Sequence, residues 1–178
     1  HPDANPVIIL FLTQSLSDAE IKALNNYVHS GGTLIADLNP GVYDEFYVMR
    51  QDNPLSKVFG VEISGDAAIS QAGSLMVGDG TMSASILGGS ISLRPEAKAL
   101  GSIQMRSKAL ETPGIRVNES TGKVADAGVI HSYGKGRALY MNFAISNYYA
   151  KNSRRQNESF PVVACMKTLL DAVGVRVS

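Results

Sequence analysis

A stretch near the N-terminus constrains the fold of this chain more than any other feature. Residues 7–12 are six consecutive apolar side chains, a pattern typical of a strand that is buried on both faces of a parallel sheet. A second strand-like run occupies residues 33–38, after a segment with helical periodicity. Strand, helix and strand in this order form a βαβ unit, so we expect two parallel strands joined by a right-handed crossover.

The helix between these strands carries its own start and stop signals. Ser17 and Glu20 have the spacing of a capping box, in which two side chains satisfy unpaired backbone N–H groups of the first turn. Ile21 and Leu24 begin an apolar face at helical spacing. The helix should end at Gly31, because glycine accepts the left-handed conformation that often follows a helix.

The middle of the chain has a weaker pattern. Residues 64–93 are rich in glycine, serine and alanine, and Asp79-Gly80 is a hairpin turn signal. We therefore expect short antiparallel strands there, within a less regular β-rich insertion that covers residues 64–126. Further strand candidates are residues 100–105 and 115–117.

The C-terminal third again has clear signals. Residues 128–133 and 137–143 are strand-like and flank a glycine-containing loop at 134–136, which predicts an antiparallel hairpin. Pro161 then opens a helix at a position where no N–H is needed, and Gly174 closes it. The apolar face of this helix contains Val162, Met166, Leu169, Leu170 and Val173.

Composition excludes several classes of protein. The chain has 178 residues, which is the size of one domain covering residues 1–178. Sixteen Lys and Arg balance sixteen Asp and Glu, which argues against a partner such as nucleic acid or a membrane surface. No apolar run approaches the roughly 20 residues that span a bilayer. The chain begins with His1 rather than methionine, so we expect a piece of a longer protein.

The sequence lacks the motifs of the common catalytic centres. No G-x-S-x-G or G-x-C-x-G nucleophile elbow is present, and Cys165 falls within the apolar C-terminal helix, which predicts a buried structural thiol. The three histidines have no metal-site spacing, and Gly134-Lys135-Gly136 does not match a phosphate-binding loop. We therefore expect no catalytic residue, no metal ion and no cofactor.

Polar residues cluster where the predicted strands end. Ligands of open α/β sheets bind near the carboxyl ends of strands, so residues there form a candidate ligand or interface rim. The adjacent carboxylates of Asp44 and Glu45 could serve as an acid and base pair. A role in organising the loop or an interface is favoured, because neighbouring side chains in an extended loop point apart. The rim contains Thr13, Gln14, Asn39, Tyr43, Asp44, Glu45, Asn142 and Asn147, with Ser15 beside them.

Three segments, in this order and spacing, resemble the trimerisation domain of family 42 β-galactosidases. The first is residues 16–36, with the helix, Gly31-Gly32 and the start of the second strand. The second is residues 41–45, followed by 53–55 and 59–61. The third is residues 133–143, with the glycine-containing hairpin. The resemblance implies a class I glutamine amidotransferase-like, flavodoxin-like fold, that is, a three-layer sandwich with a mainly parallel sheet. Copies of such a domain also occur in large bacterial multidomain proteins.

The resemblance also implies a function. Glycosidase chemistry in that family belongs to a separate barrel domain with two glutamates, and this chain has no such barrel. The family domain lacks the elbow cysteine of amidotransferases, as this chain does. We therefore expect a non-catalytic accessory domain of a β-galactosidase-like glycoside hydrolase. Its partner would be either further copies of itself, which form a trimer in the family, or a catalytic barrel of the same parent chain.

Two other hypotheses remain open from the residues. The chain could be a small-ligand or carbohydrate-binding module that uses the rim at the strand ends. Alternatively, it could be a hydrolase that works through Asp44 or Glu45.

Overall fold

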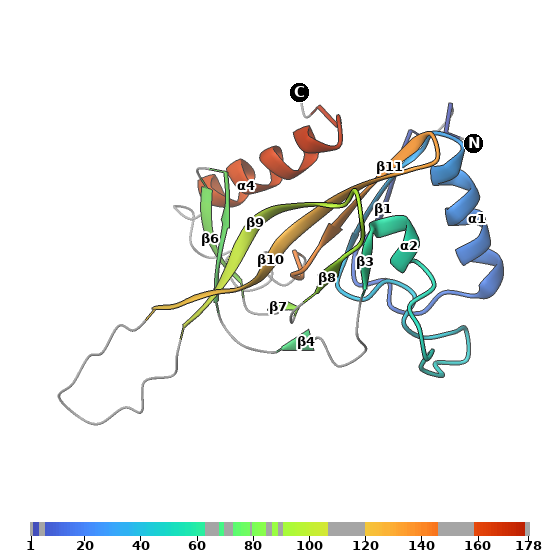
Figure 1. The fold of residues 1–178 in the computed structure, drawn as a ribbon, viewed down its shortest axis with the longest axis horizontal. Helices are drawn as coiled ribbons and strands as arrows, with labels where there is room; N and C mark the ends of the chain where they lie inside the picture. Colours follow the sequence, from blue (N-terminus) through green and yellow to red (C-terminus); the bar gives the residue numbers. More distant parts are fainter. Residues whose placement is uncertain are drawn as a thin grey trace.

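A mixed seven-stranded sheet with helices on both faces organises the chain (Figure 1). The computed structural model describes residues 2–3, 6–62, 68–69, 73–78, 80–84, 87–88, 91–106, 120–145 and 159–176. The elements in chain order are β1 (Val7–Leu10), α1 (Asp18–His29), β2 (Thr33–Asp37), α2 (Ser56–Phe59), β3 (Val61–Glu62), β4 (Ala68–Ile69), β5 (Gly73–Val77), β6 (Gly80–Ala84), β7 (Leu87–Gly88), β8 (Ser92–Leu93), β9 (Lys98–Arg106), β10 (Ser120–Tyr133), β11 (Gly136–Met141) and α4 (Ser159–Ala172). The strand order of the main sheet is β1-β2-β11-β10-β9-β5-β6.

The predicted βαβ unit is confirmed. β1 and β2 are parallel, with Val7 opposite Thr33, and α1 connects them. The N-cap is Ser17, and both hydrogen bonds of the capping box with Glu20 are present. The expectation that the first strand is buried on both faces is wrong, because β1 lies at the edge of the sheet and Ile9 is 50% exposed. An apolar run predicts a strand but does not determine its place in the sheet order.

The sheet is only partly parallel. β2 pairs in parallel with β1 and with β11, whereas the pairs β11/β10, β10/β9, β9/β5 and β5/β6 are antiparallel. The predicted hairpin is confirmed, with Tyr133 opposite Gly136, so the turn has two residues rather than three. The fold is therefore α/β with a mixed sheet, and the mainly parallel sheet of a flavodoxin-like three-layer sandwich is not confirmed.

The middle of the chain belongs to the main sheet more than its composition indicates. β5, β6, β9 and the first part of β10 fall within residues 64–126, where we expected a less regular insertion, and they extend the sheet beyond β11. The two-residue connection between β5 and β6 permits only an antiparallel pair of these two strands. The hairpin predicted at Gly80 is present between β5 and β6. Two small antiparallel pairs, β3/β8 and β4/β7, stand apart, and residues 115–117 lie outside the described residues.

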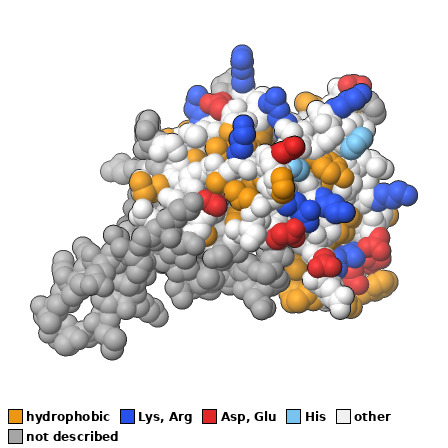
Figure 2. Space-filling model, in the orientation of Figure 1, with side chains coloured by type: hydrophobic (Ala, Val, Ile, Leu, Met, Phe, Trp, Pro, Cys, Tyr) orange, Lys and Arg blue, Asp and Glu red, His pale blue; other side chains and the backbone are white. Residues whose placement is uncertain are grey.

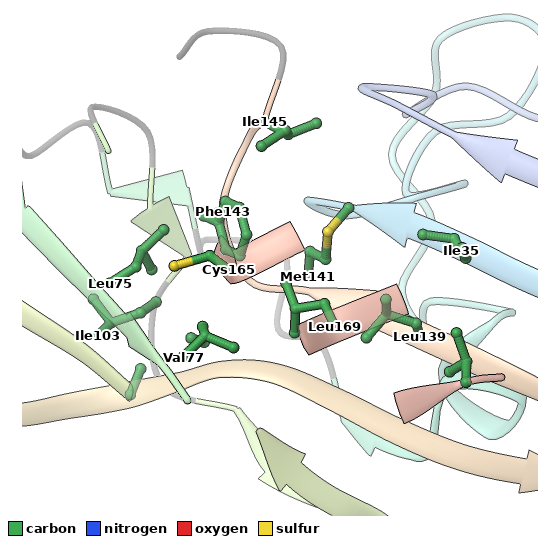
Figure 3. Packing of buried hydrophobic residues seen from close by; sticks show 13 residues of the cluster. Ile35, Leu75, Val77, Ile103, Leu139, Met141, Phe143, Ile145, Cys165 and Leu169 are labelled. Atoms are coloured by element: carbon green, nitrogen blue, oxygen red, sulfur yellow. The ribbon is translucent and has the colours of Figure 1, made fainter. Parts of the chain in front are cut away.

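Two apolar clusters fill the two faces of the sheet. On one face, Cys165 and Leu169 of α4, with Val173 directly after the helix, pack on strands β2, β5, β9, β10 and β11. Figure 3 shows Cys165 and Leu169 among side chains of these strands. On the other face, α1 and α2 pack on β2, β10 and β11. Burial raises the pKa of the Cys165 thiol, as expected for a structural cysteine. The last helix begins at Ser159, two residues before the predicted Pro161.

Candidate functional site

The loops that follow β1 and β2 lie side by side, as the strand order predicts. The backbone N–H of Gly41 donates to the carbonyl of Thr13 at 3.1 Å, and the N–H of Tyr43 donates to the carbonyl of Gln14 at 2.9 Å. Leu16 returns a hydrogen bond from its N–H to the carbonyl of Tyr43 at 3.1 Å. Thr13, Gln14 and Tyr43 of the predicted rim therefore come together through backbone contacts.

Asp44 shapes the loop that leaves this rim. Its Oδ1 accepts hydrogen bonds from the backbone N–H groups of Phe46 at 2.9 Å and Val48 at 2.8 Å. Its backbone N–H donates to the carbonyl of Val48 at 3.0 Å, and the hydroxyl of Ser15 donates to its carbonyl at 2.6 Å. The Asp44 carboxylate is thus occupied by the backbone of its own loop, while the neighbouring Glu45 is exposed. This arrangement fits the organising role better than an acid and base pair.

Four consecutive apolar side chains project from this loop, and we call Phe46, Tyr47, Val48 and Met49 the apolar loop. Their exposed fractions are 80%, 69%, 60% and 53%. Tyr47 stacks on Tyr43 with ring centroids 4.9 Å apart and an interplanar angle of 13°. Figure 1 places the loop at the lower right, and Figure 2 shows apolar and acidic side chains gathered in that region. Exposed apolar side chains gathered in this way are a common feature of interaction surfaces.

Arg50 anchors the end of the apolar loop to the start of α1. Its Nη1 lies 2.7 Å from Oδ1 of Asp18, and its Nη2 donates to the carbonyl of Leu16 at 2.9 Å. The loop is therefore tied to the body of the domain at both ends, by Asp44 and by Arg50. The sequence signal for the apolar loop is the run of four apolar residues between turn signals, which was not among the residues predicted for the rim.

A group of buried polar side chains lies beneath the rim, at the ends of β2 and β11. Asp37 is fully buried and accepts hydrogen bonds from the backbone N–H groups of Leu12 at 2.5 Å and Ile145 at 3.3 Å. Burial raises the pKa of its carboxyl group. Burial also raises the pKa of the Tyr140 phenol far above its ordinary value, and the nearby charge of Asp37 adds to the effect.

Two asparagines of the predicted rim belong to this interior rather than to the surface. Asn39 is buried and has a positive φ of 54°, a conformation that asparagine tolerates better than most residues. Asn142 is fully buried, and its Nδ2 donates to the carbonyl of Asp126 at 3.1 Å. Asn147, the last residue predicted for the rim, lies outside the described residues.

Two general features of the described residues bear on function. No group of three or more histidine, cysteine, aspartate or glutamate residues in this part of the chain could hold a metal ion. None of the described helices is long and apolar enough to cross a membrane.

Comparisons with known proteins identify the fold but not a family. No protein-family model and no curated protein matches this sequence. Among solved structures, a β-galactosidase from Rahnella sp. R3 matches with a TM-score of 0.66 at 18% identity, over 96% of this chain and 23% of that one. Gan42B, a GH42 β-galactosidase from G. stearothermophilus, matches with a TM-score of 0.60 at 17% identity, over 84% and 21%. An α-L-fucosidase from Paenibacillus thiaminolyticus matches with a TM-score of 0.63 at 14% identity, over 97% and 26%.

The coverage is the informative part of these matches. This chain spans about a quarter of the length of the glycosidases that it resembles. The identities are too low to show more than a shared fold. The chain thus has the fold of one segment of GH42 β-galactosidases and related glycosidases, as expected of a fragment of a larger glycosidase.

Proposed function

We propose that this chain is a non-catalytic accessory domain of a glycosidase and that it acts in assembly. The observation that carries the proposal is the fold match, which takes in nearly all of this chain but only about a quarter of each glycosidase. We assign the domain to the type that the sequence resembles, the trimerisation domain of family 42 β-galactosidases. Its partner is then a second copy of the chain or the catalytic barrel of the parent protein.

The apolar loop supports a role in assembly. Two fully exposed aromatic rings together carry some 300–500 Å² of apolar surface, which approaches half of the surface that each partner buries in a standard interface. Phe46 and Tyr47 are mostly exposed, and Val48 and Met49 enlarge the same surface. The loop is also held in one shape by Asp44 and Arg50, which lowers the entropy lost on binding.

A non-catalytic role agrees with the state of the rim carboxylates. The Oδ1 atom of Asp44 accepts two backbone hydrogen bonds from its own loop, so this carboxylate holds the loop rather than facing a substrate. The hydrolase hypothesis predicts that wild-type protein cleaves a chromogenic galactoside and that Asp44→Asn with Glu45→Gln abolishes the reaction. Absence of turnover in the wild type would already exclude it.

The oligomeric state tests the assembly proposal. Light scattering after size exclusion, at two protein concentrations, should show association of the wild type, and Phe46→Ser with Val48→Ser should shift it toward the monomer. Val163→Ser is the matched control, because Val163 is also apolar and 58% exposed but lies on α4. A monomer at both concentrations that also fails to bind a glycosidase barrel would contradict the proposal.

A second candidate function is carbohydrate binding at the rim. The exposed rings of Phe46 and Tyr47 could stack on the apolar face of a sugar, as aromatic side chains do with planar apolar ligands. Calorimetric titration with galactosides distinguishes this role. Saturable heat that Tyr47→Ala removes would favour it, and flat heats at high ligand concentration would exclude it.

A further inference from the structure

A hollow of about 270 Å³ lies beside the C-terminal end of α4. Its lining includes the polar residues Glu96, Lys98, His131, Ser132 and Arg137, and Ile130 and Val173 form an apolar wall. This volume is just below the roughly 300–1,000 Å³ of pockets for drug-sized ligands. It therefore suits a ligand of about the size of a monosaccharide.

Strand register places the donor side chains of the hollow on one face of the sheet. Lys98 of β9 pairs with Ile130 of β10, which pairs with Leu139 of β11. Directly paired residues point to the same face, and so do residues two positions apart in a strand. Leu139 packs in the cluster that includes α4, so Lys98 faces α4 as well. Ser132 and Arg137 are paired with each other and lie two positions from Ile130 and Leu139, which puts them on that same face.

The two cations of the hollow are available for a ligand. Neither the Lys98 nor the Arg137 side chain forms an ion pair or hydrogen bond with any other described residue. The Arg137 side chain reaches the C-terminal end of α4, where its Nη1 lies 3.0 Å from the point that a β-carbon on Gly174 would occupy. A lysine on β9 and an arginine on β11, with a serine hydroxyl on the strand between them, place donors on one face of the sheet and in one hollow, a set that suits a carboxylate.

Glu96 adds an acceptor at the edge of this hollow, on a strained turn. Ala97 donates its N–H to the carbonyl of Arg94 at 3.2 Å, which places Pro95 and Glu96 at the two central positions. Glu96 has a φ of 73°, a value at which glycine is strongly preferred in this type of turn. A non-glycine residue kept in such a conformation points to a functional constraint. A carboxylate here can accept hydrogen bonds from ligand hydroxyls.

We propose that this hollow binds a sugar acid, that is, a polyhydroxy compound with one carboxylate. The ligand carboxylate would lie between Lys98 and Arg137 and accept a hydrogen bond from the hydroxyl of Ser132. The sugar hydroxyls would donate hydrogen bonds to the carboxylate of Glu96. The apolar wall of Ile130 and Val173 would contact the C–H groups of the ring. This site is independent of the apolar loop, so its failure leaves the assembly proposal untouched.

Titration calorimetry with three probes tests the ligand class. Glucuronate carries the carboxylate and the hydroxyls, glucose lacks the carboxylate, and acetate lacks the hydroxyls. We expect saturable binding of glucuronate and at least about tenfold weaker binding of the other two, since charge-assisted hydrogen bonds contribute differences of this size. Backbone amide shifts in NMR spectra should map the glucuronate contact to residues 96–98, 132 and 137. No saturable binding, or acetate or glucose binding as tightly as glucuronate, would overturn the proposal.

Variants separate the site from a general effect of charge. Lys98→Ala and Arg137→Gln should each weaken glucuronate binding about tenfold, whereas Lys135→Ala should not, because Lys135 is an exposed cation at the β10–β11 turn. Glu96→Gly should raise the midpoint of unfolding by relieving the turn, yet weaken the binding of glucuronate relative to that of acetate, which has no hydroxyl for Glu96 to accept. The assigned contacts would be contradicted if Lys135→Ala lost as much affinity for glucuronate as the other variants, or if Glu96→Gly bound glucuronate as tightly as the wild type.

Discussion

The carboxylate of Asp37 lies 2.5 Å from the backbone nitrogen of Leu12 and accepts its hydrogen bond. Its second oxygen accepts the N–H of Ile145, 108 positions further along the chain. One buried side chain at the end of β2 therefore holds both the segment that leaves β1 and the segment that follows β11. Leu12 has a φ of 49°, which is unfavourable for leucine, so this hydrogen bond helps to maintain a conformation that the residue would not adopt alone.

The raised pKa of Asp37 predicts a particular pH dependence of stability. Burial is the largest cause of the increase in this pKa, because it opposes ionisation of the Asp37 carboxyl group in the folded protein. The folded protein then binds the proton of Asp37 more tightly than the unfolded chain does. Its contribution to stability is fully present below the pKa of an unfolded aspartate, about 3.9, and is lost as the pH rises through the folded value.

Urea unfolding of wild type and Asp37→Asn at a series of pH values measures this contribution. We expect the free energy of unfolding of the wild type, relative to that of the variant, to fall as the pH rises from about 4 to 7. Asp52→Asn is the control for removing one negative charge, because Asp52 is exposed. A wild type that gains stability relative to Asp37→Asn over this range would show that the hydrogen bonds outweigh burial.

The N-terminal cap of α1 is a second test of the local structure. Ser17→Ala removes the side chain that accepts the Glu20 N–H at 3.3 Å and donates to the Glu20 carboxylate at 2.7 Å. We expect a loss of about 0.5–2 kcal/mol in the free energy of unfolding, the range for cap residues. Ser30→Ala is the matched control at the other end of the helix, where the backbone N–H of Ser30 makes the cap hydrogen bonds. Equal losses in the two variants would contradict the role of the capping box.

Local signals explain why one part of the fold could be predicted. The capping box of Ser17 and the turn at Gly134 act within a few residues, so the helix, the parallel pair and the hairpin follow from the sequence. The position of β1 at the edge of the sheet does not follow from such signals. It depends on the pairing of β11 with the other side of β2. Strands β5 and β6 have weak intrinsic preferences. The position of β5 is set by pairing with β9, which is distant in the sequence, and β6 pairs with β5.

The candidate site divides in the same way. Chain order and parallel pairing were enough to bring Thr13 and Gln14 beside Tyr43. Burial could not be read from composition, so Asn39 was assigned to the surface and the buried Asp37 was overlooked. Asp37 follows three buried apolar residues in β2, and a lone acidic residue at the end of such a strand is the signal that could have revealed it.

Packing of α4 on the sheet gives a third prediction. Leu169 is fully buried among β-strand side chains, and its Cδ2 lies 2.9 Å from where a β-carbon on Gly128 would be (Figure 3). Leu169→Ala should lower the free energy of unfolding by about 2–5 kcal/mol, the range for large-to-small changes in a core. Val163→Ala, at an exposed position of the same helix, should change it by less than about 0.5 kcal/mol. Similar decreases in the free energy of unfolding of the two variants would show that Leu169 does not lie on the buried face of α4.

The fourth prediction separates the shape of the apolar loop from its composition. Asp44→Ala leaves the four apolar side chains in place but removes the acceptor of two backbone hydrogen bonds. We expect the loop to lose its fixed shape and self-association to weaken by about 5- to 30-fold, equivalent to roughly 1–2 kcal/mol of added ordering entropy. Sedimentation equilibrium measures the change.

Two control variants separate loop shape from charge. Asp44→Asn should associate like the wild type, because its amide oxygen can accept the same hydrogen bonds. Glu45→Ala, which removes the adjacent exposed carboxylate, should also associate like the wild type. Association that depends on Glu45 rather than Asp44 would mean that charge, not loop shape, controls the contact.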